Sequence, residues 1–137
     1  MAEVDVSGAD GLPEATVAAL VRAALREEGA AVGRVSVSFV APEVITGFNR
    51  THRDKDRPTD VLSYPFDGSF PHGPGGEVVV CPEVVTRYAV RDGRDRTEAL
   101  RETIVHGVLH LLGYTDDTDR GAARMADRTA AILTGAR

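Results

Sequence analysis

The stretch His106-Gly-Val-Leu-His110-Leu-Leu-Gly113-Tyr-Thr-Asp116 decides how this chain folds and what it can bind. Apolar residues surround the two histidines, which predicts a buried helix over residues 97–112. Histidines four residues apart on a helix project from the same face. The glycine suits the end of the helix and lets the chain turn back, so that Asp116 comes close to both imidazoles.

The spacing HxxxHxxGxxD predicts a site for one zinc ion, bound by His106, His110 and Asp116. A histidine pair alone at this spacing is more often structural or solvated. Two buried histidines need partners, however, and the glycine and the carboxylate at these offsets favour a metal. Three protein ligands leave a fourth position for water, as in catalytic zinc sites. Zinc would lower the pKa of that water to about 7.

A zinc protease with the extended HExxHxxGxxH motif is the obvious rival interpretation. Such proteases use the glutamate after the first histidine as the general base. Here that position is Gly107, which can neither accept nor deliver a proton. The sequence therefore retains the metal scaffold and disfavours peptide hydrolysis.

Outside the histidine helix, hydrophobic periodicity and Gly/Pro punctuation predict further helices over residues 13–28, 42–49, 82–90 and 118–133. Strands are expected over residues 35–40, 61–64 and 77–81, and an exposed loop over residues 67–75, which includes His72. This order favours an α+β fold with a small mixed sheet of about four strands, about five covering helices and a zincin-like metal helix. We expect one domain over residues 1–137.

Composition and charge limit the classes of partner. The net charge is −5, with 16 Lys and Arg against 21 Asp and Glu, which argues against coating nucleic acid by global attraction but leaves room for a local basic cleft. No apolar run approaches the roughly 20 residues that span a bilayer, and the first residues lack the pattern of a secretory signal. The single cysteine, Cys81, is expected to be a small buried hydrophobe. We expect a cytoplasmic protein with no membrane partner.

A second informative segment precedes the predicted strand at residues 61–64. Its basic residues are Arg50, Arg53, Lys55 and Arg57. In one interpretation they form a solvated turn whose charge is balanced by Asp54 and Asp56. In the other, an arginine here binds a phosphate and stabilises the charge that develops on it in the transition state. Three arginines on the last predicted helix, Arg120, Arg124 and Arg128, form either a second basic stripe or a solvated face neutralised by neighbouring aspartates.

The histidine stretch and the basic segment together resemble the YbeY family of bacterial endoribonucleases, which are rRNA maturation factors. The family pattern N-x-x-x-R-x-x-D-x-P-T-[ND]-V-L-S-F-P reads here as residues 49–65, with Tyr64 in place of Phe. The G-D-I-x-[IL] strand is similar to residues 76–80, and H-G-x-L-H-L-x-G-Y-D-H is similar to residues 106–116. The resemblance covers most of the chain from Phe48 to Asp116.

This resemblance implies a zinc-dependent endoribonuclease specific for single-stranded RNA, acting in 16S rRNA 3′-end maturation and ribosome quality control. Its partners would be the 16S rRNA precursor, the small ribosomal subunit and the assembly factors of that subunit. The matching arginine is Arg53, which the resemblance places beside the metal as a catalytic residue. Candidates for further substrate contacts are Arg50, His52, Lys55 and Arg57.

One departure from the family concerns the third metal ligand, which is usually histidine and here is Asp116. Aspartate is an acceptable zinc ligand, but its charge should make the bound water less acidic than an all-histidine site would. Thr115 replaces the usual aspartate before it, so Asp117 and Asp119 are the competing candidates, and we favour Asp116.

The sequence leaves the reaction itself open. Either a zinc-activated water attacks the phosphodiester, or the RNA 2′-hydroxyl attacks with zinc as Lewis acid. No general base is assigned. The alternatives to a nuclease are a non-enzymatic ribosome assembly factor with a structural zinc site and a zinc hydrolase of another substrate.

Overall fold

The computed structural model describes residues 2–65 and 75–136. Within these residues the strands form one four-stranded mixed sheet in the order β1-β2-β4-β3. The strands are β1 (Glu3–Ser7), β2 (Arg34–Phe39), β3 (Val61–Pro65) and β4 (Gly75–Val80). β1 and β4 both run parallel to β2, and β3 runs antiparallel to β4 at the edge. The expected loop over residues 67–75 lies outside the described residues except for Gly75, which begins β4.

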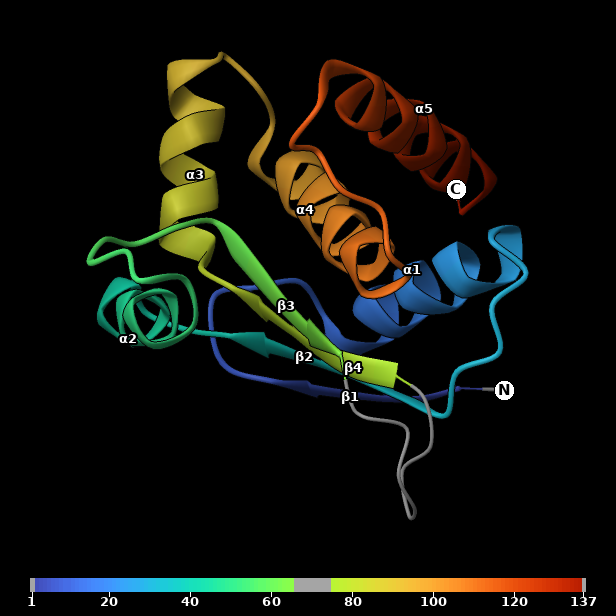
Figure 1. The fold of residues 1–137 in the computed structure, drawn as a ribbon, viewed down its shortest axis with the longest axis horizontal. Helices are drawn as coiled ribbons and strands as arrows, with labels where there is room; N and C mark the ends of the chain where they lie inside the picture. The colour runs from blue at the N-terminus through green and yellow to red at the C-terminus, as the bar shows by residue number, and fades with distance from the viewer. Residues whose placement is uncertain (1, 66–74, 137) are drawn as a thin grey trace.

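Five helices accompany the sheet in the described part of the chain: α1 (Glu14–Glu27), α2 (Pro42–Arg53), α3 (Pro82–Arg91), α4 (Arg96–Leu111) and α5 (Asp119–Gly135). Figure 1 shows α1, α4 and α5 stacked above one face of the sheet, with α4 between α5 and the strands. The predicted α+β class is confirmed. No helix of the described residues is long and apolar enough to cross a membrane.

Alternation along the strands divides the apolar residues between two cores. Val35, Val37 and Phe39 of β2 point into the larger core, which α1, α4 and α5 complete. A smaller core on the opposite face joins Ile45 of α2 to residues of β3, β4 and α3 and to the fully buried Cys81 between β4 and α3. The cysteine is therefore the small apolar residue that its surroundings predict.

Helix α4 is buried along most of its length because it packs against α1, α3, α5, β3 and β4. Its start is capped by the Asp95 carboxylate, which accepts a hydrogen bond from the Glu98 backbone N–H. Its end is marked by Gly113 at φ +99°, after which the Tyr114 N–H returns to the Leu109 carbonyl. The predicted helix and its glycine stop are confirmed, and they fix the turn that leads to Asp116.

The structure adds one strand that the periodicity analysis did not place, and it lengthens one predicted helix. The fourth strand is β1, in a stretch for which no strand was predicted. Helix α2 continues past Asn49 to Arg53. Basic side chains in its last turn interact favourably with the helix dipole, and Asp54 ends the helix in the left-handed region at φ +54°. His52 and Arg53 are thus presented by a helix end, where the sequence suggested a turn.

Candidate metal centre

Three side chains from α4 and the loop after it converge on one point. His106 Nε2 and His110 Nε2 lie 3.1 Å apart, and Asp116 Oδ2 lies 3.5 Å from the first and 4.0 Å from the second. Ligands of a tetrahedral zinc ion with ordinary bond lengths are about 3.3 Å apart. The three residues that the sequence predicts as ligands are therefore close enough to hold one divalent metal ion.

The protonation of His110 suits metal binding. Its Nδ1 lies 3.0 Å from the Tyr114 carbonyl oxygen, which can only accept a hydrogen bond. Nδ1 therefore carries the proton, and the lone pair of Nε2 points into the cluster. A backbone carbonyl fixes the tautomer that a metal ligand needs.

The surroundings of His106 favour its neutral form. Burial lowers the pKa of His106, and the neighbouring His110 lowers it further, while the Asp116 carboxylate opposes both effects. A neutral imidazole at pH 7 offers its lone pair to a metal without first losing a proton. The site is thus built for a cation rather than for a charged histidine.

The turn that carries Asp116 is tied to the rest of the molecule through Tyr114. The Tyr114 hydroxyl donates a hydrogen bond to the Glu28 carboxylate beside the end of α1, and Arg128 of α5 pairs with the same carboxylate at 2.6 Å. The Arg124 guanidinium lies 5.0 Å above the Tyr114 ring. Two of the three arginines on the last helix therefore hold this turn in place.

Gly107 lies where a side chain would collide with the sheet. A Cβ atom at this position would meet Val78 Cγ1 at 2.5 Å. The Ser63 hydroxyl also donates a hydrogen bond of 2.8 Å to the Gly107 carbonyl, which holds α4 close to β3. A glutamate at this position does not fit, so the packing supports the argument against a zinc protease.

His106, His110 and Asp116 line a cavity of about 780 Å³, which we call the metal cavity. Its lining includes both predicted residues of the end of α2, His52 and Arg53. No carboxylate of the described residues forms a salt bridge with Arg53. An unpaired guanidinium in a cavity with potential metal ligands can bind a phosphate.

The other predicted substrate contacts lie outside the lining of the metal cavity. Arg50 forms an exposed salt bridge of 2.5 Å with Asp56, and neither Lys55 nor Arg57 lines the cavity. Of the competing aspartates, Asp117 lines the cavity but is not part of the metal cluster, and Asp119 begins α5.

Several residues at or beside this cavity were not predicted as site residues from the sequence. Asp60, Ser63, Tyr64 and Thr115 also line the metal cavity. The signal for Ser63 was its polar side chain in an apolar strand. Asn49 is 2% exposed, and its side-chain N–H donates to the Arg57 carbonyl at 2.9 Å, so it closes the loop that follows Arg53. Its position in the motif was noted, but its role needed the fold.

The chain is similar to known proteins of one family. The sequence profile of the family described as "Endoribonuclease YbeY" matches residues 7–137. The chain is 41% identical to an "Endoribonuclease YbeY" of Salinispora tropica, over 79% of this chain and 77% of that protein. It is 38% identical to one of Thiobacillus denitrificans, over 93% and 84%.

The fold has a counterpart among solved structures. It is similar to the solution structure of TM1509 from Thermotoga maritima, with a TM-score of 0.66 and 27% identity over 97% of this chain and 88% of that one. The match of sequence profile, relatives and fold extends over nearly the whole chain, well beyond the three motifs. The chain therefore belongs to the YbeY endoribonuclease family.

Proposed function

We propose that this protein is a zinc-dependent endoribonuclease that cuts single-stranded RNA. The observation that carries the proposal is the shared cavity: His106, His110 and Asp116 lie in the same hollow as Arg53. From its family we further propose that it acts in the cytoplasm on 16S rRNA precursors during 3′-end maturation and ribosome quality control, in contact with the small ribosomal subunit and its assembly factors.

Each residue has a distinct task in this proposal. His106, His110 and Asp116 hold one zinc ion, which supplies Lewis-acid chemistry when bound. Arg53 binds non-bridging oxygens of the scissile phosphate, orients it and stabilises the charge that develops on it. Tyr114 keeps His110 in the tautomer that leaves Nε2 free.

The test is cleavage of a short unstructured RNA by zinc-loaded protein, beside His110→Ala and Arg53→Ala proteins purified identically. We expect each variant to lose at least about tenfold in rate, which is about 1.4 kcal/mol of barrier. Replacing a single 2′-hydroxyl by hydrogen at the cut site distinguishes the two nucleophiles, because attack by that hydroxyl then stops while attack by water continues.

Equal cleavage by all three proteins would show a contaminating ribonuclease. If none cleaves while the wild type still binds zinc, the nuclease proposal fails for this substrate. The assembly-factor alternative then has the better support.

A further inference from the structure

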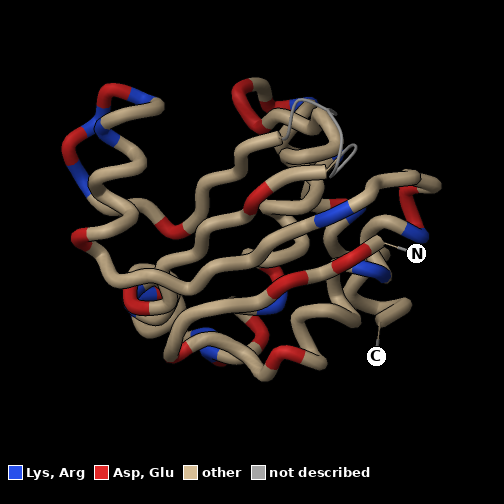
Figure 2. The backbone as a smooth tube through the Cα atoms, turned by 90° about the horizontal axis from the view of Figure 1, so that it is seen from below, with Lys and Arg blue, Asp and Glu red and all other residues tan. Residues whose placement is uncertain are grey.

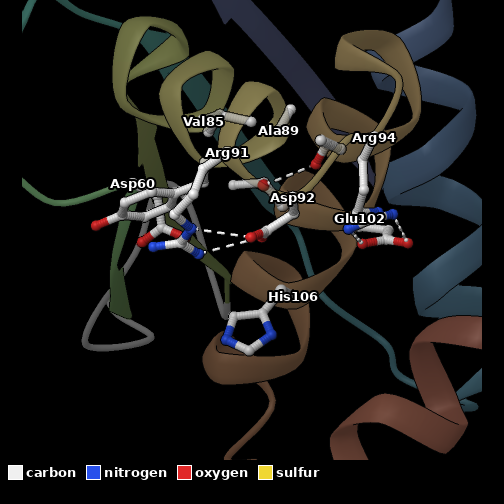
Figure 3. Close-up of a pocket in the computed structure, with 11 residues that line it drawn as sticks. Asp60, Val85, Ala89, Arg91, Asp92, Arg94, Glu102 and His106 are labelled. Atoms are coloured by element: carbon white, nitrogen blue, oxygen red, sulfur yellow. Dashed lines mark hydrogen bonds and ion pairs between the residues drawn. The ribbon is translucent and has the colours of Figure 1, made fainter.

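A second cavity of about 250 Å³ lies beside the metal cavity, between α3 and α4. Figure 3 shows Arg91 and Asp92 at the end of α3 above His106 of α4, with Glu102 further back along that helix. Tyr88 also lines this α3–α4 cavity. Asp60 and His106 line both cavities, so the second cavity opens beside the metal centre.

The two cavities follow one face of α4. Ala99, Thr103, His106 and His110 are spaced three or four residues apart, so they lie along the same side of the helix. The rise along the helix from His106 to Ala99 is about 10 Å. The two cavities therefore lie next to each other along α4, with the metal ligands toward one end, and this arrangement suits an extended chain.

The wall of the α3–α4 cavity carries a stacking group. Tyr88 is a large side chain that is 43% exposed, and the Arg91 guanidinium lies over one face of its ring, 4.9 Å from the ring centre, which leaves the other face of the ring and the outer face of the guanidinium for a base. Asp92 holds Arg91 through two hydrogen bonds of 2.9 and 3.1 Å. Aromatic rings and guanidinium planes are the surfaces on which unpaired bases stack.

The two cavities differ in whether their arginines are already paired with carboxylates. In the α3–α4 cavity the arginines are already engaged, Arg91 by Asp92 and Arg94 by Glu102. Asp60 adds a further carboxylate, which makes the lining net negative and unfavourable for a phosphate. The metal cavity also carries more carboxylates than arginines, but its Arg53 has no carboxylate partner among the described residues, and a divalent ion held by His106, His110 and Asp116 would offset the excess negative charge. The metal cavity therefore suits the charged phosphate of an RNA chain, and the α3–α4 cavity suits an uncharged base.

We propose that the α3–α4 cavity is a subsite for one unpaired nucleobase beside the scissile phosphate, with Tyr88 and Arg91 as its stacking platform. This inference rests on the proposed function, because the phosphate must lie in the metal cavity for the neighbouring base to reach α3. The subsite recognises the flat face of a base and so is tolerant of its identity.

The experiment combines protein and RNA changes. Short RNAs, each with one abasic nucleotide at a successive position around the cut, are cleaved by the wild type, Tyr88→Ala, Tyr88→Phe and Val90→Ala. Val90 is the matched control because it is 75% exposed on the same helix and does not line the cavity. Binding of the intact single strand is measured in parallel by fluorescence anisotropy, and thermal unfolding verifies that each variant is folded.

We expect Tyr88→Ala to weaken binding and raise KM about tenfold, while Tyr88→Phe and Val90→Ala remain near wild type. One abasic position should cost the wild type a similar factor and cost Tyr88→Ala little, because the two changes remove the same contact. The subsite is overturned if folded Tyr88→Ala binds and cleaves like Val90→Ala, or if the wild type binds no single strand. Binding that depends on Tyr88 without any cleavage would retain the subsite and refute the proposed nuclease instead.

Discussion

At the scale of single residues, Gly107 shows how tightly the metal helix is set against the sheet. Gly107→Ala places a methyl group 2.5 Å from Val78 Cγ1, so we expect it to lower the free energy of unfolding by about 1–3 kcal/mol. Gly47→Ala in α2 is the matched control, because a methyl group there meets nothing within 4 Å and should stabilise the helix by about 0.5–1 kcal/mol. Urea unfolding measures both, and equal effects would refute the steric argument.

The identity of the third metal ligand is a second question at this scale. Asp116 lies within reach of both histidines, whereas Asp117 lies outside the cluster. We expect Asp116→Ala to weaken zinc affinity by more than the roughly 10–100-fold caused by losing an outer-shell partner, and Asp117→Ala to leave it near wild type. Competition with a chromogenic chelator measures the affinities. If Asp117→Ala lost more zinc affinity than Asp116→Ala, the third ligand would be Asp117.

At the scale of elements, the turn after α4 depends on two other helices. Tyr114→Phe removes the hydrogen bond to Glu28, a carboxylate that is only 10% exposed. We expect a loss of about 1–2 kcal/mol in unfolding free energy, because hydrogen bonds to charged groups are strong. Zinc affinity should fall as well, since the Tyr114 carbonyl orients His110. Unchanged zinc affinity in a destabilised variant would limit Tyr114 to a purely structural role.

The same contacts predict a dependence on pH. The pKa of Glu28 is lowered from its ordinary value of 4.5: burial raises it, but the hydrogen bonds from Tyr114 and Arg128, with the charges of Arg128 and Arg124, lower it by more. A lowered carboxylate pKa contributes stability that is fully present above about pH 4.5 and is lost as pH falls through the folded value. The stability difference between wild type and Glu28→Gln should therefore shrink below pH 4.5, as acid-unfolding curves can show.

The elements also show what local sequence could predict. Helix α4 was placed within a residue because periodicity, the buried face and the Gly113 stop all agree. The metal cluster was predicted from the spacing of the two histidines together with the apolar helix around them and the glycine and carboxylate that follow. Strand β1 was missed because its pairing partner in β2 lies some 30 residues away, and its register is a property of the sheet. The α3–α4 cavity was hidden for a similar reason, since it depends on how two helices cross.

At the scale of the whole molecule, the distribution of charge governs how RNA reaches the site. Figure 2 shows basic and acidic residues interleaved along the backbone, in keeping with a net charge of −5. Such a surface gives little general attraction for a polyanion. Affinity must then come from a few local contacts, and Arg53 is a candidate for one of them because it lines the same cavity as the proposed metal ligands.

The salt dependence of RNA affinity tests this interpretation. It also tests whether Lys55 and Arg57 contact RNA phosphates. For single strands the slope of log affinity against log salt is about −0.7 for each phosphate neutralised, so we expect a shallow wild-type slope of about −1 to −2. Arg53→Ala should reduce its magnitude by about 0.7. Lys55→Ala and Arg57→Ala should leave it unchanged, because neither side chain lines the cavity. Fluorescence anisotropy of a labelled oligonucleotide between about 50 and 200 mM salt measures the slopes. A reduction by Lys55→Ala or Arg57→Ala as large as that by Arg53→Ala would extend the phosphate path beyond the cavity, along the loop that Asn49 closes.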